Sequence, residues 1–223
     1  MVNAWFWLTL ALIILNWLAV WFEWRWANLA SKPGVIAAML VWYTSVCCCQ
    51  PPALWFGLGL VFSLAGDVLL MMPNRFFLYG NAAFMLAHSA YILGFNQPPP
   101  EFSLIMISLF VAFLSLMLII YAALRQGVKS SPAFRRMAAP LAVYSLVISL
   151  MVLSALSTLF RPQWHPSASG LVVSGALLFL FSDILLAFDR FVQSLPPARL
   201  WKRVAYQLGQ LALVAGAMVH FSR

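Results

Sequence analysis

The stretch FSLAGDVLLMMPNRFFLYGNAAFMLAHSAYILGF, residues 62–95, decides the fold. It places one carboxylate, Asp67, inside an apolar segment, turns at a proline, and returns with His88 inside a second apolar segment. A carboxylate in such a segment costs about 2.5–3.5 kcal/mol to insert into a membrane, so it is expected to face a bundle interior and to have a function. A second carboxylate, Asp183, has the same setting in the sequence LLFLFSDILLAF. The sequence therefore predicts a helical membrane bundle that holds two aspartates and a histidine together.

The composition indicates the class of protein. Of the 223 residues, 64% are hydrophobic and 8% are charged, and the mean hydropathy is +0.94, whereas soluble domains carry roughly 25% charged residues. We therefore expect an all-α protein and a single integral membrane domain over residues 1–223. The net charge of +8 does not point to nucleic acid, because the basic residues lie between apolar segments, where they contact lipid headgroups and set topology.

Eight apolar segments follow one another along the chain. Each has about 17 to 23 residues, which is the length needed to cross the hydrocarbon core of a bilayer. Proline-rich breaks separate most of them. The sequence thus predicts eight transmembrane helices, approximately at residues 4–22, 33–49, 53–72, 76–95, 102–124, 137–160, 167–188 and 200–221.

The basic residues also predict the orientation of the bundle. Eleven of the thirteen Lys and Arg side chains lie in alternate connections, the first, third, fifth and seventh, and the other two are Arg161 and Arg223. By the positive-inside rule, this bias places those connections in the cytoplasm and both termini on the non-cytoplasmic side. We expect a multi-pass protein of a bacterial inner membrane. No oligomeric state is predicted.

The three cysteines are consecutive, from Cys47 to Cys49. Adjacent residues do not have the spacing of a disulfide framework or a zinc site. We expect them to pack among apolar side chains, with lipidation and redox chemistry as the alternatives.

The predicted topology brings several polar residues to similar depths. Asp67 and Asp183 each lie five residues before the cytoplasmic end of a predicted helix, which is on the order of 7 to 8 Å. His88 lies near the middle of the fourth helix. Tyr206 and Gln210 share one face of the eighth, because they are four residues apart. A polar pocket open toward the inner leaflet follows if these faces meet.

Two buried carboxylates suggest acid and base chemistry. Burial and a neighbouring carboxylate both disfavour ionisation, so one aspartate is expected to hold a proton while the other stays ionised. The sequence contains no nucleophile elbow, Gly-rich phosphate loop or paired-histidine zinc motif. A metal held by Asp67, Asp183 and His88 stays an alternative, although three ligands are few for a metal site. We predict no metal and no cofactor.

These residues form a pattern that resembles the YhhN family of lysoplasmalogenase-like membrane proteins. The resemblance covers most of the chain. It rests on these residues: Lys32-Pro33, Gly66-Asp67 with Leu69-Leu70, Gly80, Phe84, Ala87-His88, Tyr91, Gly175-Ala176, Phe179, Ser182-Asp183, Tyr206 and Gln210.

The resemblance implies an eight-helix hydrolase that cleaves the vinyl ether of a lysoplasmalogen, a lysophospholipid-type substrate. The products are a fatty aldehyde and a glycerophospho-headgroup. In this interpretation the catalytic residues are Asp67, Asp183 and His88. The expected substrate-binding residues are Lys32, which would hold the phosphate, and Tyr91, Ser182, Tyr206 and Gln210.

Two other classes of protein remain open on the sequence alone. A proton-coupled transporter also uses intramembrane acids, but it needs water access to them from each face in turn. A non-enzymatic lipid-binding or scaffold protein needs no cavity at all. In that case both aspartates would be saturated by hydrogen bonds within the protein.

Overall fold

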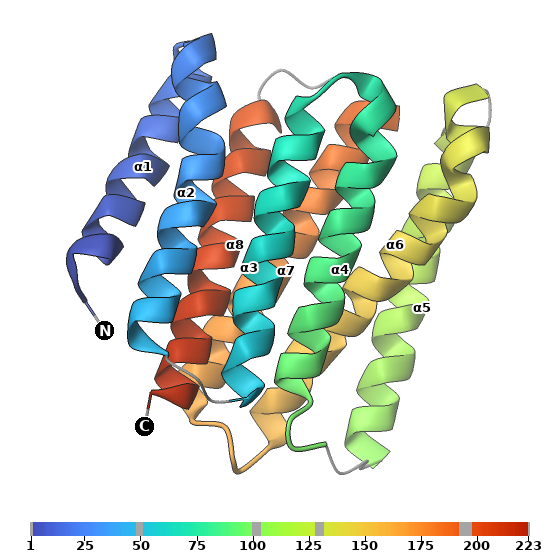
Figure 1. Cartoon of the computed structure of the whole chain (residues 1–223). Helices are drawn as coiled ribbons and strands as arrows, with labels where there is room; N and C mark the ends of the chain where they lie inside the picture. The colour runs from blue at the N-terminus through green and yellow to red at the C-terminus, as the bar shows by residue number, and fades with distance from the viewer. Residues whose placement is uncertain (1, 48–50, 100–103, 128–131, 192–197, 223) are drawn as a thin grey trace.

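The computed structural model describes residues 2–47, 51–99, 104–127, 132–191 and 198–222. Within these ranges the chain forms long α-helices, two short 3-10 turns and no strand, as the composition predicted. The helices pack side by side in one bundle (Figure 1). They are α1 (Ala4–Trp21), α2 (Arg25–Val46), α3 (Pro51–Met71), α4 (Phe77–Phe95), α5 (Leu104–Gly127), α6 (Pro132–Ser157), α7 (Pro166–Phe191) and α8 (Ala198–Phe221).

Seven helices in the described ranges are long and apolar enough to cross a bilayer. These are α1 to α4 and α6 to α8. In α5, the apolar stretch Met106–Ile119 is shorter than a full span by the same measure. The structure therefore supports a multi-pass membrane protein, whereas the count of eight crossings stays a prediction.

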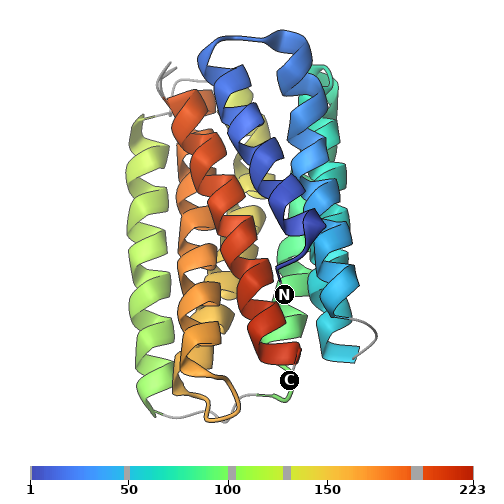
Figure 2. The same ribbon diagram turned by 90° about the vertical axis from the view of Figure 1, so that its left-hand side faces the viewer.

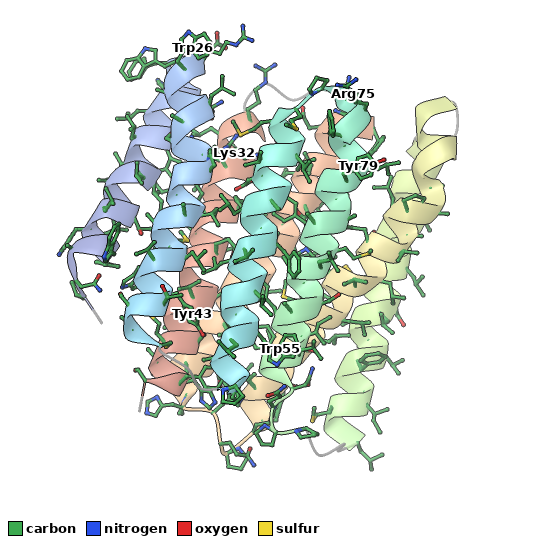
Figure 3. All side chains as sticks on the ribbon, viewed as in Figure 1. Trp26, Lys32, Tyr43, Trp55, Arg75 and Tyr79 are labelled. Atoms are coloured by element: carbon green, nitrogen blue, oxygen red, sulfur yellow. The ribbon has the colours of Figure 1, made fainter. Side chains whose placement is uncertain are left out.

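The two ends of the bundle differ in their side chains. Trp26, Lys32 and Arg75 lie toward one end, and Tyr43 and Trp55 lie toward the other (Figure 3). The marks N and C in Figure 1 lie toward that second end. The residues that border the first and third predicted connections thus lie at the end opposite the termini. Which side of the membrane this end faces stays a prediction.

Helix α8 occupies a central position. It packs closely against α7 and also contacts α1, α2 and α3, and Figure 2 shows it between α1 and α7. Glycines allow the close approach of α7 and α8: a Cβ atom on Gly175 would lie 2.7 Å from the carbonyl oxygen of Gly209, and one on Gly209 would lie 2.9 Å from that of Gly175. Small residues at such seams are typical of membrane helices, because they let two backbones meet.

The first helix boundary differs from the prediction. The second helix begins at Arg25 and not at Pro33, so Pro33 lies inside α2. The chain turns earlier, at Phe22 and Glu23, where Glu23 adopts a left-handed φ of 55°. Membrane helices tolerate an internal proline because neighbouring helices and side chains satisfy the freed backbone groups. Lys32 therefore lies inside α2. The predicted boundary at Pro33 had placed it just before the helix.

Two further helices extend beyond their predicted boundaries. Helix α6 begins at Pro132, and α7 continues to Phe191, so Asp183 lies eight residues before the end of its helix rather than five. Cys47 follows α2 and packs half-buried against the core. Cys48 and Cys49 lie outside the described residues.

Candidate active site

A cavity of about 180 Å³ opens among α2, α3, α4, α7 and α8, and both predicted aspartates line it. Asp67 comes from α3 and Asp183 from α7, which are separated in the sequence by more than a hundred residues. The remaining lining combines cationic or hydroxyl side chains with three apolar ones. They are Lys32, Ser182, Arg199, Lys202, Arg203 and Tyr206, together with Leu70, Phe84 and Leu186.

Asp67 is held by groups from two other helices. The Lys32 ammonium of α2 lies 3.0 Å from one carboxylate oxygen, and the Tyr206 hydroxyl of α8 donates a hydrogen bond of 3.0 Å to the other. Only 2% of the Asp67 side chain is exposed. These contacts place a cation and a hydrogen-bond donor beside the buried carboxylate, and a buried anion needs both.

Asp183 has a different set of partners. The Tyr144 hydroxyl of α6 donates a hydrogen bond of 2.6 Å to Oδ2 of Asp183. The Nε2 atom of His88 lies 3.0 Å from the same hydroxyl and 3.6 Å from Oδ2. No Lys or Arg in the described part of the chain forms an ion pair with Asp183. The second aspartate is therefore held by the hydrogen bond from Tyr144 rather than by a Lys or Arg.

His88 lies behind Asp183 and does not line the cavity. The imidazole is fully buried, and the edge of Phe179 contacts it, with ring centroids 4.7 Å apart. A neutral ring that donates from Nε2 to the Tyr144 oxygen completes a chain from His88 through Tyr144 to Asp183. In this arrangement His88 can act on the cavity only through its neighbours.

Tyr91 and Gln210, predicted to bind substrate, lie outside the lining of this cavity. The Tyr91 hydroxyl donates to the Gln210 side-chain oxygen at 2.7 Å, and the Gln210 amide donates to Ser63 Oγ at 2.8 Å. These bonds join α4, α8 and α3 in the buried core. The geometry gives both residues a role in helix packing.

Ser182, Tyr206 and Lys32 do line the cavity. The Ser182 hydroxyl donates to the backbone oxygen of Lys202 at 3.1 Å, so it also ties α7 to α8. Tyr206 and Lys32 both contact Asp67. Each of the three is in reach of a bound molecule, although its own hydrogen bond is already formed within the protein.

The sequence analysis missed several residues of this site. It did not single out Tyr144, and it treated Arg199 and Arg203 only as signals of topology. The spacing of Arg199, Arg203 and Tyr206, at steps of four and three, places them on one face of α8 and could have indicated their shared cavity. The Nη1 atom of Arg203 is buried and has no hydrogen-bond partner among the described residues. Such a group is suited to bind an anion.

The described residues contain no group of three or more His, Cys, Asp or Glu side chains that could hold a metal ion. What the cavity offers is a pair of carboxylates with different partners, beside cationic side chains. This arrangement can transfer protons at one position and hold a negatively charged group at another.

The fold and the site define a polytopic helical membrane protein with two aspartates on the wall of one cavity. The chain belongs to the YhhN family, whose model matches residues 24–217. The expected family is thereby confirmed.

Curated relatives of this chain carry the name lysoplasmalogenase. Lysoplasmalogenase TMEM86B of Mus musculus is 36% identical over 160 residues, which are 72% of this chain and 62% of that protein. The human TMEM86B is 32% identical over 162 residues, with the same two shares. The human lysoplasmalogenase TMEM86A is 29% identical over 174 residues, covering 76% of this chain and 67% of that protein. The matched region thus spans somewhat less than two thirds of the TMEM86B relatives. No solved structure matches the chain.

Proposed function

We propose that this chain is a membrane lysoplasmalogenase, which hydrolyses the vinyl ether bond of a single-chain alkenyl glycerophospholipid. The products are a fatty aldehyde and a glycerophospho-headgroup. The observation that carries the proposal is the pair of aspartates, from α3 and α7, on the wall of one cavity that also holds four cationic side chains. The printed name of the relatives supports the same activity.

The different partners of the two aspartates suggest different roles. Asp67, with the Lys32 ammonium at 3.0 Å, is assigned as the ionised carboxylate. Asp183 accepts from Tyr144 through Oδ2, and its Oδ1 forms no hydrogen bond with the described residues, so we assign the transferred proton to that oxygen. We assign Asp183 as the general acid and Asp67 as the base, since an acid and a base in one site need environments that keep them apart.

The first step moves a proton from Asp183 to the alkene carbon that is not bonded to oxygen. The alkene electron pair forms the new C–H bond, and the carbon next to the ether oxygen becomes an oxocarbenium ion. The Asp67 carboxylate stabilises this cation electrostatically, as carboxylates do in glycoside hydrolysis. Both aspartates are then ionised.

In the second step a water molecule adds to the oxocarbenium carbon and gives a proton to Asp67. The resulting hemiacetal collapses: its hydroxyl proton passes to Asp183, the C–O bond to glycerol breaks, and the glycerol oxygen takes the proton from Asp67. The aldehyde and the alcohol leave with all atoms accounted for, and both aspartates return to their starting states.

The phosphate of the substrate needs a cation that is not already neutralised. Lys32, which the sequence analysis assigned to the phosphate, is paired with Asp67, and Lys202 is paired with Asp189. We therefore assign the phosphate to Arg199 and Arg203, because guanidinium groups bind phosphate oxygens in a planar, two-point geometry. This assignment leaves Lys32 as the partner of the catalytic carboxylate.

The test is aldehyde release by the purified protein in detergent, with an alkenyl lysophospholipid and its ester counterpart as substrates. Asp67→Asn and Asp183→Asn should each lower kcat by about 100-fold or more, which is the usual contribution of general acid and base catalysis. Glu23→Gln is the matched control, since Glu23 is an exposed acid that does not line this cavity, and it should retain turnover.

Folding of each variant is checked by its thermal unfolding and by size-exclusion chromatography. Full turnover in either folded Asp→Asn variant removes that residue from the mechanism. An absence of turnover by the wild-type protein, together with proton uptake into vesicles that contain it, would instead support the transporter hypothesis.

A further inference from the structure

A second cavity, of about 90 Å³, lies on the other side of Asp183. It is bounded by α4, α5, α6 and α7, and Asp183 and Leu186 line it as well as the cavity described above. Asp183, which we assign as the acid, therefore lies between the cationic cavity and this second cavity.

The second cavity is apolar on the surfaces that would face an occupant. Its wall includes Met117, Leu141, Ile148 and Leu180. The polar side chains on its wall already have partners within their own helices: the Asn81 amide donates to the Phe77 carbonyl at 2.8 Å, and the Ser145 hydroxyl donates to that of Leu141 at 2.8 Å. The Tyr144 hydroxyl donates its hydrogen bond to Asp183.

We infer that this apolar cavity binds the first carbons of the substrate's hydrocarbon chain, next to the scissile bond. The inference deepens the proposed function and rests on it. A single-chain lipid has one point at which its polar and apolar parts meet, and the vinyl ether lies at that point. With the phosphate on Arg203 and the chain against Ile148 and Leu180, that bond is brought to Asp183.

The continuity of this cavity with the aspartate site indicates the kind of molecule that occupies it. A molecule that extends from the cationic cavity into the apolar one must be anionic at one end and aliphatic at the other, so a lysophospholipid fits this requirement. The protein also contains a second apolar cavity that serves as a control. This cavity, of about 190 Å³, lies between α5 and α6 and is lined by Met106, Leu153 and Phe160 among others, none of which lines the aspartate site.

The experiment uses a lysophospholipid analogue whose alkyl ether is saturated and therefore resists hydrolysis, with a photoreactive diazirine on one of the first chain carbons. After irradiation of the purified protein, the crosslinked residues are mapped by mass spectrometry. We expect labels on residues 141–148 of α6 and 180–187 of α7, which an excess of unlabelled analogue abolishes. Labels that concentrate on the lining of the α5–α6 cavity, or labels that competitor does not reduce, would overturn the inference.

Two serines provide matched variants. Ser145 lines the proposed chain cavity and Ser157 lines the α5–α6 cavity, and each hydroxyl donates to a carbonyl of its own helix at 2.8 Å. Ser145→Leu should weaken binding of the analogue about fourfold for each methylene it displaces, because a buried methylene contributes about 0.8 kcal/mol and 1.4 kcal/mol is a factor of ten. Ser157→Leu should leave binding unchanged. Equal effects of the two variants would contradict the assignment.

Ala187→Phe is a second filling variant, which serves if Ser145→Leu fails to fold. Ala187 lines the same cavity, is partly exposed, and lies one turn after Asp183. It should likewise reduce labelling on α6. Crosslinking requires no turnover, so its result is independent of the aldehyde assay. Labelling of the cavity without aldehyde release would reject the proposed reaction and keep the site for the hydrocarbon chain. Aldehyde release without labelling of the cavity would reject that site alone.

Discussion

Lys32 is a largely buried partner of Asp67, a role that its position in the sequence did not predict. It lies two turns inside α2 with only 11% of its side chain exposed, and its ammonium contacts the carboxylate of Asp67. Each of these charges is stable in the membrane interior because of the other. The pair therefore couples the position of α2 to the state of the aspartate that we assign as the base.

Lys32→Met should both destabilise the protein and lower kcat. Removal of one partner of a buried ion pair costs about 3–5 kcal/mol, because the other charge is left without compensation. The measurements are thermal unfolding and aldehyde release. In the double variant Lys32→Met with Asp67→Asn, the unfolding temperature should recover while turnover stays lost. A double variant as unstable as Lys32→Met alone would contradict the pairing.

Tyr144 is a positioning residue for Asp183, since its hydroxyl contacts both Asp183 and His88. Tyr144→Phe should lower kcat by about 10- to 100-fold, because Asp183 becomes an anion as it gives up its proton and a hydrogen bond to a charged group contributes about 1.5–3 kcal/mol. The KM should change little, since the hydroxyl does not hold the headgroup.

Tyr43→Phe is the control for this prediction. The Tyr43 hydroxyl is also buried and donates to the Ala53 carbonyl at 2.6 Å, but it lies toward the opposite end of the bundle (Figure 3). It should affect stability alone. A purely structural role for Tyr144 would instead produce the same kinetic profile in both variants.

At the level of the helices, the seam between α7 and α8 fixes the geometry of the site. Asp183 is on one of these helices, and Arg203 and Tyr206 are on the other. A Cβ atom at Gly175 would meet the backbone of Gly209 at 2.7 Å, and a backbone cannot move aside as a flexible side chain can. The distance between the two helices therefore depends on the absence of a side chain at this point.

Gly175→Ala should destabilise the protein by about 1–3 kcal/mol, the usual cost of overpacking. Gly170→Ala, on the same helix, is the control. A Cβ atom there meets nothing within 4 Å, and alanine is the better helix former by about 0.5–1 kcal/mol, so this variant should be as stable as the wild type or slightly more stable. Thermal unfolding of both variants measures the difference, and equal stabilities would count against a tight seam.

The sequence was sufficient to predict the helices and the two aspartates, but not the side chains that contact these aspartates. The apolar segments and the isolated carboxylates are local features, and Asp67 and Asp183 could be singled out from them. The contacts of Lys32 and Tyr144 depend on how α2 and α6 rotate and where they begin. A misplaced boundary at Pro33 put Lys32 at a helix end, and two helices beginning earlier than expected changed which side chains face the cavity.

At the scale of the whole molecule, the charge bias predicts that the end bearing Trp26 and Arg75 faces the cytoplasm. The test replaces Cys47, Cys48 and Cys49 by alanine and introduces Trp26→Cys or Ser222→Cys. Intact cells are then treated with a maleimide that does not cross membranes. Ser222→Cys should be labelled, because both termini are predicted outside, and Trp26→Cys should be labelled only after the cells are opened. The opposite pattern would reverse the predicted orientation.

The meeting of the two cavities at Asp183 has a consequence for what happens after the bond breaks. Cleavage at such a boundary yields one fragment that dissolves in lipid and one that dissolves in water, and each already lies in the compartment that suits it. In the proposed reaction, the aldehyde would diffuse among the acyl chains while the headgroup would leave through the cationic cavity. Departure by opposite routes discourages the reverse reaction, because the two fragments no longer share a solvent.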